Sequence, residues 1–260
     1  MKLKLFQVDA FAEKTFSGNP AAVVPLEEWL PSHLMQNIAR ENNLSETVFF
    51  VPRGTNFEIR WFTPTTEVNL CGHATLAAAF VLFEHIGFNG KEIVFHSRSG
   101  KLTVKKEEKL IVLNFPTSEI NAIKLPENSA KAFGIEPQQC FKGRENLLFV
   151  FRNEKEIQNL EPDFSCLMKM EERGIIATAP SVDYDFVSRF FAPREGIDED
   201  PVTGSAHTVL IPYWSQKSGK TKLVARQISK RGGTLYCKNL GNRVEIGGNA
   251  ITYLIGEIDI

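Results

Sequence analysis

Cysteine is scarce in this chain, and the few cysteines present follow no recognisable motif. There are four, at residues 71, 140, 166 and 237, and no two stand close together. Disulfide-stapled domains and zinc modules carry cysteines in dense, regularly spaced sets. The sequence therefore predicts neither a disulfide framework nor a metal site.

Long hydrophobic runs are also missing. The longest apolar stretch, residues 74–83, is much shorter than the about 20 residues that a membrane-spanning helix needs. The first ten residues interleave lysines with apolar residues and lack the continuous apolar segment of a signal peptide. We therefore expect a cytoplasmic protein with no membrane partner.

Neither sign of charge is in excess. The 260 residues carry 30 Lys and Arg against 31 Asp and Glu, a net charge of -1. Proteins that bind nucleic acid usually present a strongly basic surface. The composition argues against a nucleic-acid partner and favours a small-molecule partner, and the length allows two modest lobes or one large domain.

What the sequence does contain is an internal repeat. Residues 60–64 (Arg-Trp-Phe-Thr-Pro) precede Gly-His-Ala-Thr at 72–75, and residues 189–193 (Arg-Phe-Phe-Ala-Pro) precede Gly-Ser-Ala-His at 204–207. Each second motif opens an apolar run, and these runs end at Gly87 and Gly219. Strand-like segments joined by a polar turn follow each run. A repeat of this length indicates a duplicated half-domain.

The coarse pattern of elements also repeats. We expect strands at 3–8, 47–51 and 57–62 with a helix at 32–42 that a serine at residue 32 caps, and then strands at 147–151, 174–179 and 186–191 with a helix at 166–170. The predicted fold class is α+β, with two pseudo-symmetric lobes, each a mostly antiparallel, curved sheet around a central helix. Proline and polar residues at 115–126 suggest a boundary between lobes 1–117 and 118–260, and whether the last strand packs on the first lobe is left open.

Both central helices begin with glycine and small residues. Gly72 and Gly204 leave the first backbone N–H groups of their helices uncovered, so that each helix start can hold a carboxylate. If the lobes are related by a pseudo-twofold axis, both helix starts face one cleft and bind a small anionic substrate between them. The alternative is that these glycines only allow close packing of helix and strand.

Three residues of the chain are candidates for moving protons. Glu46 precedes an apolar strand, and partial desolvation would raise its pKa toward neutrality. His73 lies at a helix start, where the dipole disfavours its protonated form, and Asp200 can accept hydrogen bonds. Taken singly, each has a structural explanation, as a solvated loop residue, a helix cap and a turn residue before proline. Their joint occurrence favours catalysis.

These motifs together resemble a known family. The segments are Gly-Asn-Pro-Ala at 18–21, Ser-Glu-Thr at 45–47, Cys-Gly-His-Ala-Thr at 71–75 and Asp-Pro-Val-Thr-Gly-Ser-Ala-His at 200–207. The chain is similar to the PhzF family of phenazine-biosynthesis-like isomerases, which is related in fold to diaminopimelate epimerase and proline racemase. The resemblance implies two barrel-like lobes, a site in the cleft between them, a homodimer and a reaction without a cofactor.

The resemblance also assigns roles by position. The proton-transferring glutamate falls on Glu46, and His73, Asp200 and Ser205 fall on supporting polar positions. The expected substrate-binding residues are Asn19, Cys71, Gly72, Thr203, Gly204 and Ser205. A turn-forming role of Gly18 and Pro20 is an equal alternative to ligand binding by Asn19. Asn69 stands where the family usually has aspartate, which either alters the charge near His73 or caps the helix.

Two other functions stay open at this point. The related epimerases use one cysteine from each lobe, whereas here Cys71 has no second thiol opposite it, because Thr203, Gly204 and Ser205 occupy that position. An isomerase with a single glutamate acid/base is therefore the preferred function. An epimerase that pairs Cys71 with Asp200 or Glu46 is one alternative, and a non-catalytic binding protein on the same scaffold is the other.

Overall fold

The computed structural model describes residues 1–260, which divide into two compact units. Unit 1 contains residues Met1–Phe115 and Ile246–Ile260, and unit 2 contains Pro116–Glu245. The chain returns to unit 1 within strand β16 (Arg243–Gly248).

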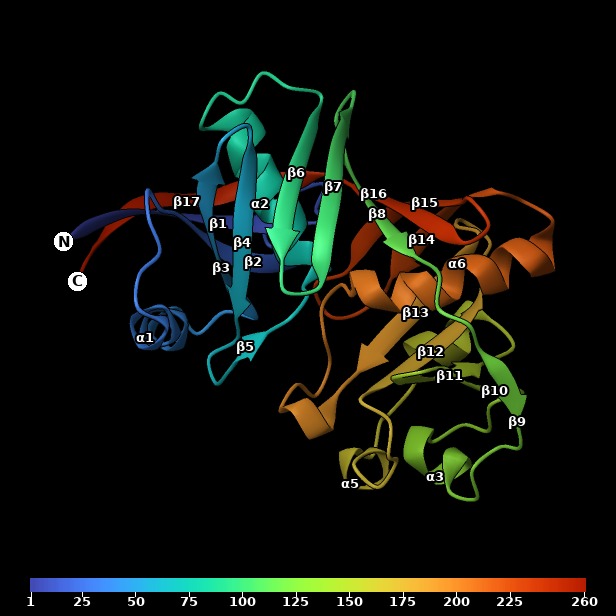
Figure 1. Ribbon diagram of the computed structural model, residues 1–260. Coiled ribbons are helices and arrows are strands. Elements are labelled where there is room, and N and C mark those ends of the chain that lie inside the picture. Colours follow the sequence, from blue (N-terminus) through green and yellow to red (C-terminus); the bar gives the residue numbers. More distant parts are fainter. The chain divides into compact units, whose positions relative to one another are not determined.

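Unit 1 contains most of the long strands and two helices (Figure 1). Its elements are β1 (Lys2–Ala10), β2 (Asn19–Pro25), α1 (Ser32–Asn42), β3 (Glu46–Arg53), β4 (Asn56–Phe62), β5 (Glu67–Val68), α2 (Gly72–Glu84), β6 (Glu92–Ser97), β7 (Gly100–Glu107), β8 (Leu110–Pro116), which ends at the boundary, and β17 (Ala250–Asp259).

Unit 2 repeats this order with shorter strands and more short helices. Its elements are β9 (Asn121–Ile123), α3 (Ser129–Phe133), β10 (Gln139–Lys142), β11 (Asn146–Val150), α4 (Glu154–Gln158), α5 (Phe164–Leu167), β12 (Gly174–Pro180), β13 (Phe186–Phe191), the 3-10 turn η1 (Pro193–Glu195), α6 (Gly204–Ser218), β14 (Lys222–Gln227) and β15 (Gly233–Asn239).

The strand pairings confirm the duplication. In unit 1, β1–β2 is antiparallel, β2–β3 parallel, β3–β4 antiparallel, β4–β6 parallel and β6–β7 antiparallel. In unit 2, β10–β11, β11–β12, β12–β13, β13–β14 and β14–β15 follow the same alternation. Parallel neighbours need a crossover connection, and helices supply it in both units. The predicted α+β class with two similar, mostly antiparallel halves is confirmed.

One buried helix forms the centre of each unit. Helix α2 has buried residues on all sides, and it contacts β1, β2, β3 and β17. Helix α6 is buried along most of its length, contacts β14 and β15, and ends at Gly219 in the left-handed conformation that favours glycine. An apolar run without a polar face is typical of a helix enclosed by a sheet.

The local predictions are mostly confirmed, with two differences. Helix α1 has the predicted bounds, but its N-cap is Pro31, and Ser32 instead accepts a hydrogen bond from Arg60 Nη2. Helix α5 begins earlier than predicted because the Asp163 side chain caps it, accepting a hydrogen bond from the Cys166 N–H. Both errors concern helix caps, which one side-chain contact decides.

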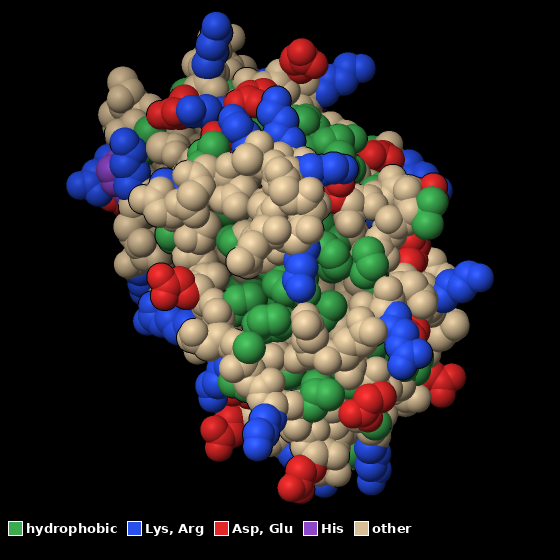
Figure 2. All heavy atoms as spheres, turned by 90° about the vertical axis from the view of Figure 1, so that its right-hand side faces the viewer, with side chains coloured by type: hydrophobic (Ala, Val, Ile, Leu, Met, Phe, Trp, Pro, Cys, Tyr) green, Lys and Arg blue, Asp and Glu red, His purple; other side chains and the backbone are tan.

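All four cysteines are free and buried. None of the helices combines the length and the apolar composition needed to cross a bilayer. On the face in Figure 2, basic and acidic side chains are interspersed rather than gathered by sign. The cytoplasmic location stays a prediction.

Candidate functional site

Helix α2 begins without a side-chain cap. Its N-cap is Cys71, whose backbone is extended and whose side chain makes no capping hydrogen bond. Asn69 is exposed and does not cap the helix, and its carbonyl oxygen accepts a hydrogen bond from Ser99 Oγ. The first N–H groups of a helix have no carbonyl partner within it. The N–H groups of Gly72 and His73 can therefore donate to an anion.

Four residues of unit 1 meet at this helix start. Asn19 and Glu46 are the first residues of the parallel strands β2 and β3, so both lie at the same end of that pair. Asn19 Nδ2 lies 3.2 Å from His73 Nδ1, and Cys71 Sγ lies 3.5 Å from the same nitrogen. On the other side of the ring, His73 Nε2 lies 3.1 Å from Glu46 Oε2. The structure thus brings the predicted site residues of the first half together.

The turn before β2 requires glycine to place Asn19. Gly18 has a φ of +70°, and a Cβ atom there would lie 2.2 Å from the Ala10 carbonyl oxygen. Asn19 itself is completely buried. The turn-forming alternative therefore describes Gly18, whereas Asn19 uses its side chain to contact His73.

The charges around His73 reverse one prediction. Burial by itself lowers the pKa of His73, but Cys71, when ionised, and Glu46 act in the opposite direction, and the pKa ends well above its ordinary value. The helix dipole had predicted a neutral ring. A carboxylate 3.1 Å away acts more strongly than the half-charge of a helix end. We infer that the contact with Glu46 favours a protonated His73.

Cys71 is a poor thiolate in this setting. Burial raises the pKa of its thiol, and the negative charge of Glu46 raises it further, while His73 acts in the opposite direction. Its side chain is almost fully enclosed. The neutral thiol is therefore the resting form at neutral pH.

Three of these residues also carry atoms that can bind a metal ion. Glu46, Cys71 and His73 each offer one ligand atom, and these atoms lie within 4.8 Å of one another. However, the imidazole directs Nδ1 at Cys71 and Nε2 at Glu46. An ion bound through one ring nitrogen would lie on the side away from the other ligand. The three groups form a row through the ring, which suits proton transfer better than metal binding.

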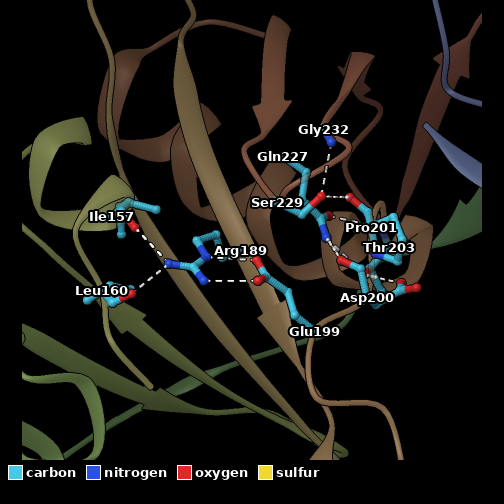
Figure 3. A network of polar contacts seen from close by, with 10 residues as sticks. All are labelled: Ile157, Leu160, Arg189, Glu199, Asp200, Pro201, Thr203, Gln227, Ser229 and Gly232. Atoms are coloured by element: carbon cyan, nitrogen blue, oxygen red, sulfur yellow. Dashed lines mark hydrogen bonds and ion pairs between the residues drawn. The ribbon is translucent and has the colours of Figure 1, made fainter. Parts of the chain in front are cut away.

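The start of α6 in unit 2 is built from a different network (Figure 3). The Thr203 hydroxyl donates to Asp200 Oδ2, and the Thr203 N–H donates to Gln227 Oε1 over 2.9 Å. Gln227 Nε2 donates to the Asp200 carbonyl oxygen at 2.8 Å and to Thr203 Oγ1 at 3.2 Å. Ser229 Oγ donates to the Pro201 carbonyl oxygen. Every contact fixes the segment that enters the helix.

Ser205 is placed differently from these buried groups. It lies in the first turn of α6, which has Thr203 as N-cap and no side-chain cap, and it is exposed. The Gly204 and Ser205 N–H groups occupy the same helical positions as those of Gly72 and His73. The second half therefore offers an exposed hydroxyl beside a helix start.

An arginine–glutamate pair supports each helix start. Arg60 donates through Nε and Nη2 to both carboxylate oxygens of Glu67, at 2.7 and 2.8 Å. Arg189 does the same to Glu199, at 2.7 and 2.9 Å, and its Nη1 donates to the Ile157 and Leu160 carbonyl oxygens (Figure 3). The glutamates stand at matching positions before Gly72 and Gly204. Both halves therefore contain this arginine–glutamate pair, which we call the frame of the helix start.

The chemistry within this frame is not repeated. Thr47 pairs with Phe62 and Ile175 with Phe191, so the strand register makes Gly174 the counterpart of Glu46. A Cβ atom on Gly174 would lie 2.4 Å from the Phe190 ring, so a side chain there would require neighbouring side chains to move. Likewise Thr203 and Ser205 replace Cys71 and His73 in the aligned motifs. The carboxylate at the start of the strand is present in one unit only.

Sequence reasoning missed Gln227 and both arginine–glutamate pairs. Gln227 is completely buried and shares a strand face with the buried Leu223 and Ala225. A polar residue on the apolar face of an alternating strand is a usable signal. The arginines stood in the repeat itself, but their glutamate partners could not be assigned without the fold.

Comparison with known proteins agrees with this architecture. The family model for phenazine biosynthesis-like proteins matches residues 8–256. The chain belongs to the PhzF family. An uncharacterized isomerase of Pseudomonas aeruginosa is 48% identical over 258 residues, which cover 99% of both chains. A second relative from the same organism, 46% identical over 100% of both chains, is also named an uncharacterized isomerase.

Solved structures of family members have the same fold. A PhzF family protein from Enterococcus faecalis is 46% identical, covers 100% of both chains and gives a TM-score of 0.98. A phenazine biosynthesis protein from Clostridium difficile is 45% identical, covers 99% of this chain and 100% of its own, and gives 0.94. A hydroxyproline epimerase from Agrobacterium vitis, 10% identical with a TM-score of 0.63 over 99% of this chain and 92% of its own, shares the fold.

Proposed function

We propose that this PhzF family protein is a cofactor-independent isomerase in which Glu46 moves a proton on a small carboxylate or amino-acid-like substrate. The observation that carries the proposal is the 3.1 Å contact between His73 Nε2 and Glu46 Oε2 at an uncapped helix start. In this proposal Glu46 acts as the base and His73 is the group in contact with its carboxylate. The isomerase names of the relatives agree with this reaction class.

The proposed reaction is a proton shift within one molecule. Glu46 removes a proton from an acidic C–H bond, and the electron pair moves into the adjacent conjugated system. The carboxyl proton exchanges with solvent, and the same group then returns a proton to another carbon, so that no proton or electron is gained or lost overall. His73 and Asp200 polarise the substrate or relay protons. His73 lies in the first turn of α2, and Asp200 lies just before the N-cap of α6.

The proposed binding mode uses both units. The substrate carboxylate is held by Ser205 and by the N–H groups near Gly72 and Gly204, in a cleft between the lobes, with Asn19, Cys71 and Thr203 as further contacts. Uncapped helix starts bind carboxylates well. The ordered Asp200–Thr203–Gln227 network supports this assignment, because it holds the second helix start in one conformation.

An epimerase that uses Cys71 is the second candidate. Cys71 Sγ lies 3.5 Å from His73 Nδ1, and a fold neighbour is a hydroxyproline epimerase. Against it, burial raises the pKa of this thiol, and the matching position in unit 2 is Thr203. A hydroxyl is a much weaker acid than a thiol, so a two-base mechanism lacks its second member.

Deuterium uptake from solvent tests the proposal. The probes are proline, hydroxyproline and a cyclic dienyl amino acid, incubated with the protein in D2O with excess EDTA and followed by proton NMR. We expect exchange into at least one probe, and a loss of about 10²- to 10⁴-fold in Glu46→Gln because the acid/base is removed. Cys71→Ala should stay within about tenfold of the wild type.

The control is Glu58→Gln, which changes a glutamate of β4 that contacts Trp29 and Arg53. It should exchange at the wild-type rate. Loss of exchange in Cys71→Ala alone would replace the isomerase with the epimerase. Binding of a probe without any exchange would favour a non-catalytic protein.

A further inference from the structure

The direction of the hydrogen bonds around Thr203 can be worked out from the donors available. A threonine hydroxyl has one proton and two lone pairs, and a glutamine amide donates only through nitrogen. Gln227 Oε1 accepts from the Thr203 N–H, which orients the amide with Nε2 toward the Asp200 carbonyl oxygen and Thr203 Oγ1. The Thr203 hydroxyl accepts from Gln227, and its own proton goes to Asp200 Oδ2.

We propose that Gln227 is a positioning residue that sets this direction and keeps the Asp200 carboxylate as a hydrogen-bond acceptor at the start of α6. Its role in the reaction rests on the proposed function, in which Asp200 assists Glu46. Gln227 lies at the end of β14, so it joins a strand of unit 2 to the helix start through three hydrogen bonds.

The burial and surroundings of Gln227 support this role. Gln227 is completely buried, and Asp200 and Thr203 are 9% and 7% exposed, so water does not compete for these bonds. The flanking groups are already satisfied. Glu199 pairs with Arg189, and Ser229 Oγ donates to the Pro201 carbonyl oxygen and accepts from the Gly232 N–H (Figure 3). Gln227 supplies both a donor and an acceptor to this segment.

The duplicated half shows that the frame does not require this glutamine. In unit 1, Ser99 Oγ donates to the Asn69 carbonyl oxygen, just as Ser229 does to Pro201. The serine–carbonyl bond is thus present in both units, as is the arginine–glutamate pair. The contacts of Gln227, in contrast, occur only where an aspartate precedes the helix. This pattern assigns Gln227 to the orientation of Asp200 rather than to the fold shared by both halves.

Two variants separate the acceptor and the donor of Gln227. Gln227→Met removes both, so amide hydrogen exchange at Thr203 should speed up at least tenfold, measured residue by residue by NMR. Gln227→Glu keeps the acceptor for the Thr203 N–H but loses the donor, so this amide should stay protected. Gln36→Met is the matched control, because Gln36 Nε2 donates to the Thr63 carbonyl oxygen in unit 1. It should leave Thr203 unchanged.

The second readout is the titration of Asp200, followed by ¹³C NMR of its carboxyl carbon. An introduced carboxylate beside Asp200 disfavours its ionisation. The Asp200 midpoint in Gln227→Glu should therefore lie higher than that in Gln227→Met by about one pH unit or more. In Gln227→Met the midpoint should also lie above that of the wild type, because the Thr203 hydroxyl is no longer oriented to donate to Asp200. A merely structural role would leave the wild-type midpoint in Gln227→Met. Glu199 stays paired with Arg189 in all these proteins, so its charge is common to them.

The outcomes distinguish the two proposals. Unchanged Thr203 exchange in Gln227→Met, or a wild-type Asp200 midpoint in Gln227→Met, would overturn the positioning role. If both shift as expected and the wild type exchanges no probe, the orientation of Asp200 by Gln227 stands and the proposed isomerase fails. If the wild type is active, Gln227→Met should lower kcat about tenfold or more while KM changes less than threefold.

Discussion

At the scale of single residues, the same position serves different purposes in the two halves. Thr75 donates its hydroxyl proton to the Cys71 carbonyl oxygen, four residues earlier, and His207 makes the same contact from Nδ1 to the Thr203 carbonyl oxygen at 2.9 Å. Burial lowers the pKa of His207 to about 4, and its Nε2 has no hydrogen-bond partner. The histidine therefore stays neutral in the folded protein at neutral pH.

This residue makes stability depend on pH. The unfolded chain takes up a proton at His207 near pH 6.5 and the folded chain only near pH 4, so stability falls as the pH drops through this window. The contribution to the loss between pH 7 and pH 5 is about 2 kcal/mol. His207→Thr copies Thr75 and removes the titration. We expect the variant to lose about 2 kcal/mol less than the wild type between these pH values in urea unfolding.

The control for this measurement is His33→Thr, which changes an exposed histidine of α1. At pH 7, His207→Thr should be less stable than the wild type, because the smaller side chain leaves a cavity beside Phe186, whose ring lies 5.9 Å from that of His207. An unchanged pH dependence in His207→Thr would contradict the assignment.

At the scale of elements, the frame of each half depends on one ion pair. Arg60 also stacks on Phe62, and Arg189 stacks on Phe191, at 5.2 and 5.1 Å from the ring centroids. The hydrogen bond from Arg60 is the main influence that lowers the pKa of Glu67, which burial opposes. Because both bonds are bidentate, each fixes the geometry of its strand end relative to the following helix.

Breaking either pair should destabilise the protein by similar amounts. Glu67→Gln and Glu199→Gln each leave a partly buried guanidinium without its charge partner, and the arginines are only 17% and 13% exposed. We expect a loss of about 2 kcal/mol for each variant at pH 7, less than for a fully buried pair. Urea unfolding at neutral pH measures it.

The comparison pair is Lys2 with Glu257, which are both more than half exposed. Glu257→Gln should change stability by less than about 0.5 kcal/mol. For Glu67, the folded-state pKa is lowered, so its stabilisation is present at neutral pH and is lost as the pH falls through that pKa. Equal stability of Glu67→Gln and wild type at pH 7 would show that the pair does not support the frame.

At the scale of the whole molecule, the last strand closes the first unit. β17 pairs antiparallel with β1 from Lys2 opposite Asp259 to Ala10 opposite Ala250, and the Ile260 N–H donates to the Met1 carbonyl oxygen. The two chain ends accordingly lie side by side (Figure 1). Unit 1 is thus assembled from both ends of the sequence, with unit 2 inserted between them in the chain.

Removal of residues 250–260 should therefore destabilise unit 1 specifically. β1 would lose its pairing with β17 along its whole length and keep only its pairing with β2, and helix α2 would lose its contact with β17. We expect faster amide exchange in β1 and β2, and protection of β12 and β13 close to that of the wild type, measured by hydrogen exchange. Truncation of only the last two residues should keep the wild-type pattern. Equal loss of protection in both units would contradict their separation.

Local order could be predicted from the sequence because its causes lie close together in the chain. The helix at Ser32–Asn42, the stop at Gly219 and the strands of both halves follow from periodicity and from glycine, which act within a few residues. The repeat also predicted two similar lobes. Helix caps failed at Ser32 and at α5, where Arg60 and Asp163 determined the outcome.

The sequence by itself thus determined the duplicated α+β architecture and which residues are chemically suited to proton transfer. Only the tertiary structure decided which of them meet, because contacts between strand ends depend on register. It places Glu46 against His73, which reverses the expected charge of the histidine, and it leaves only Gly174 at the equivalent position of the second half. It also brings Gln227 to Asp200 and Thr203, a contact between distant segments that no local pattern encodes.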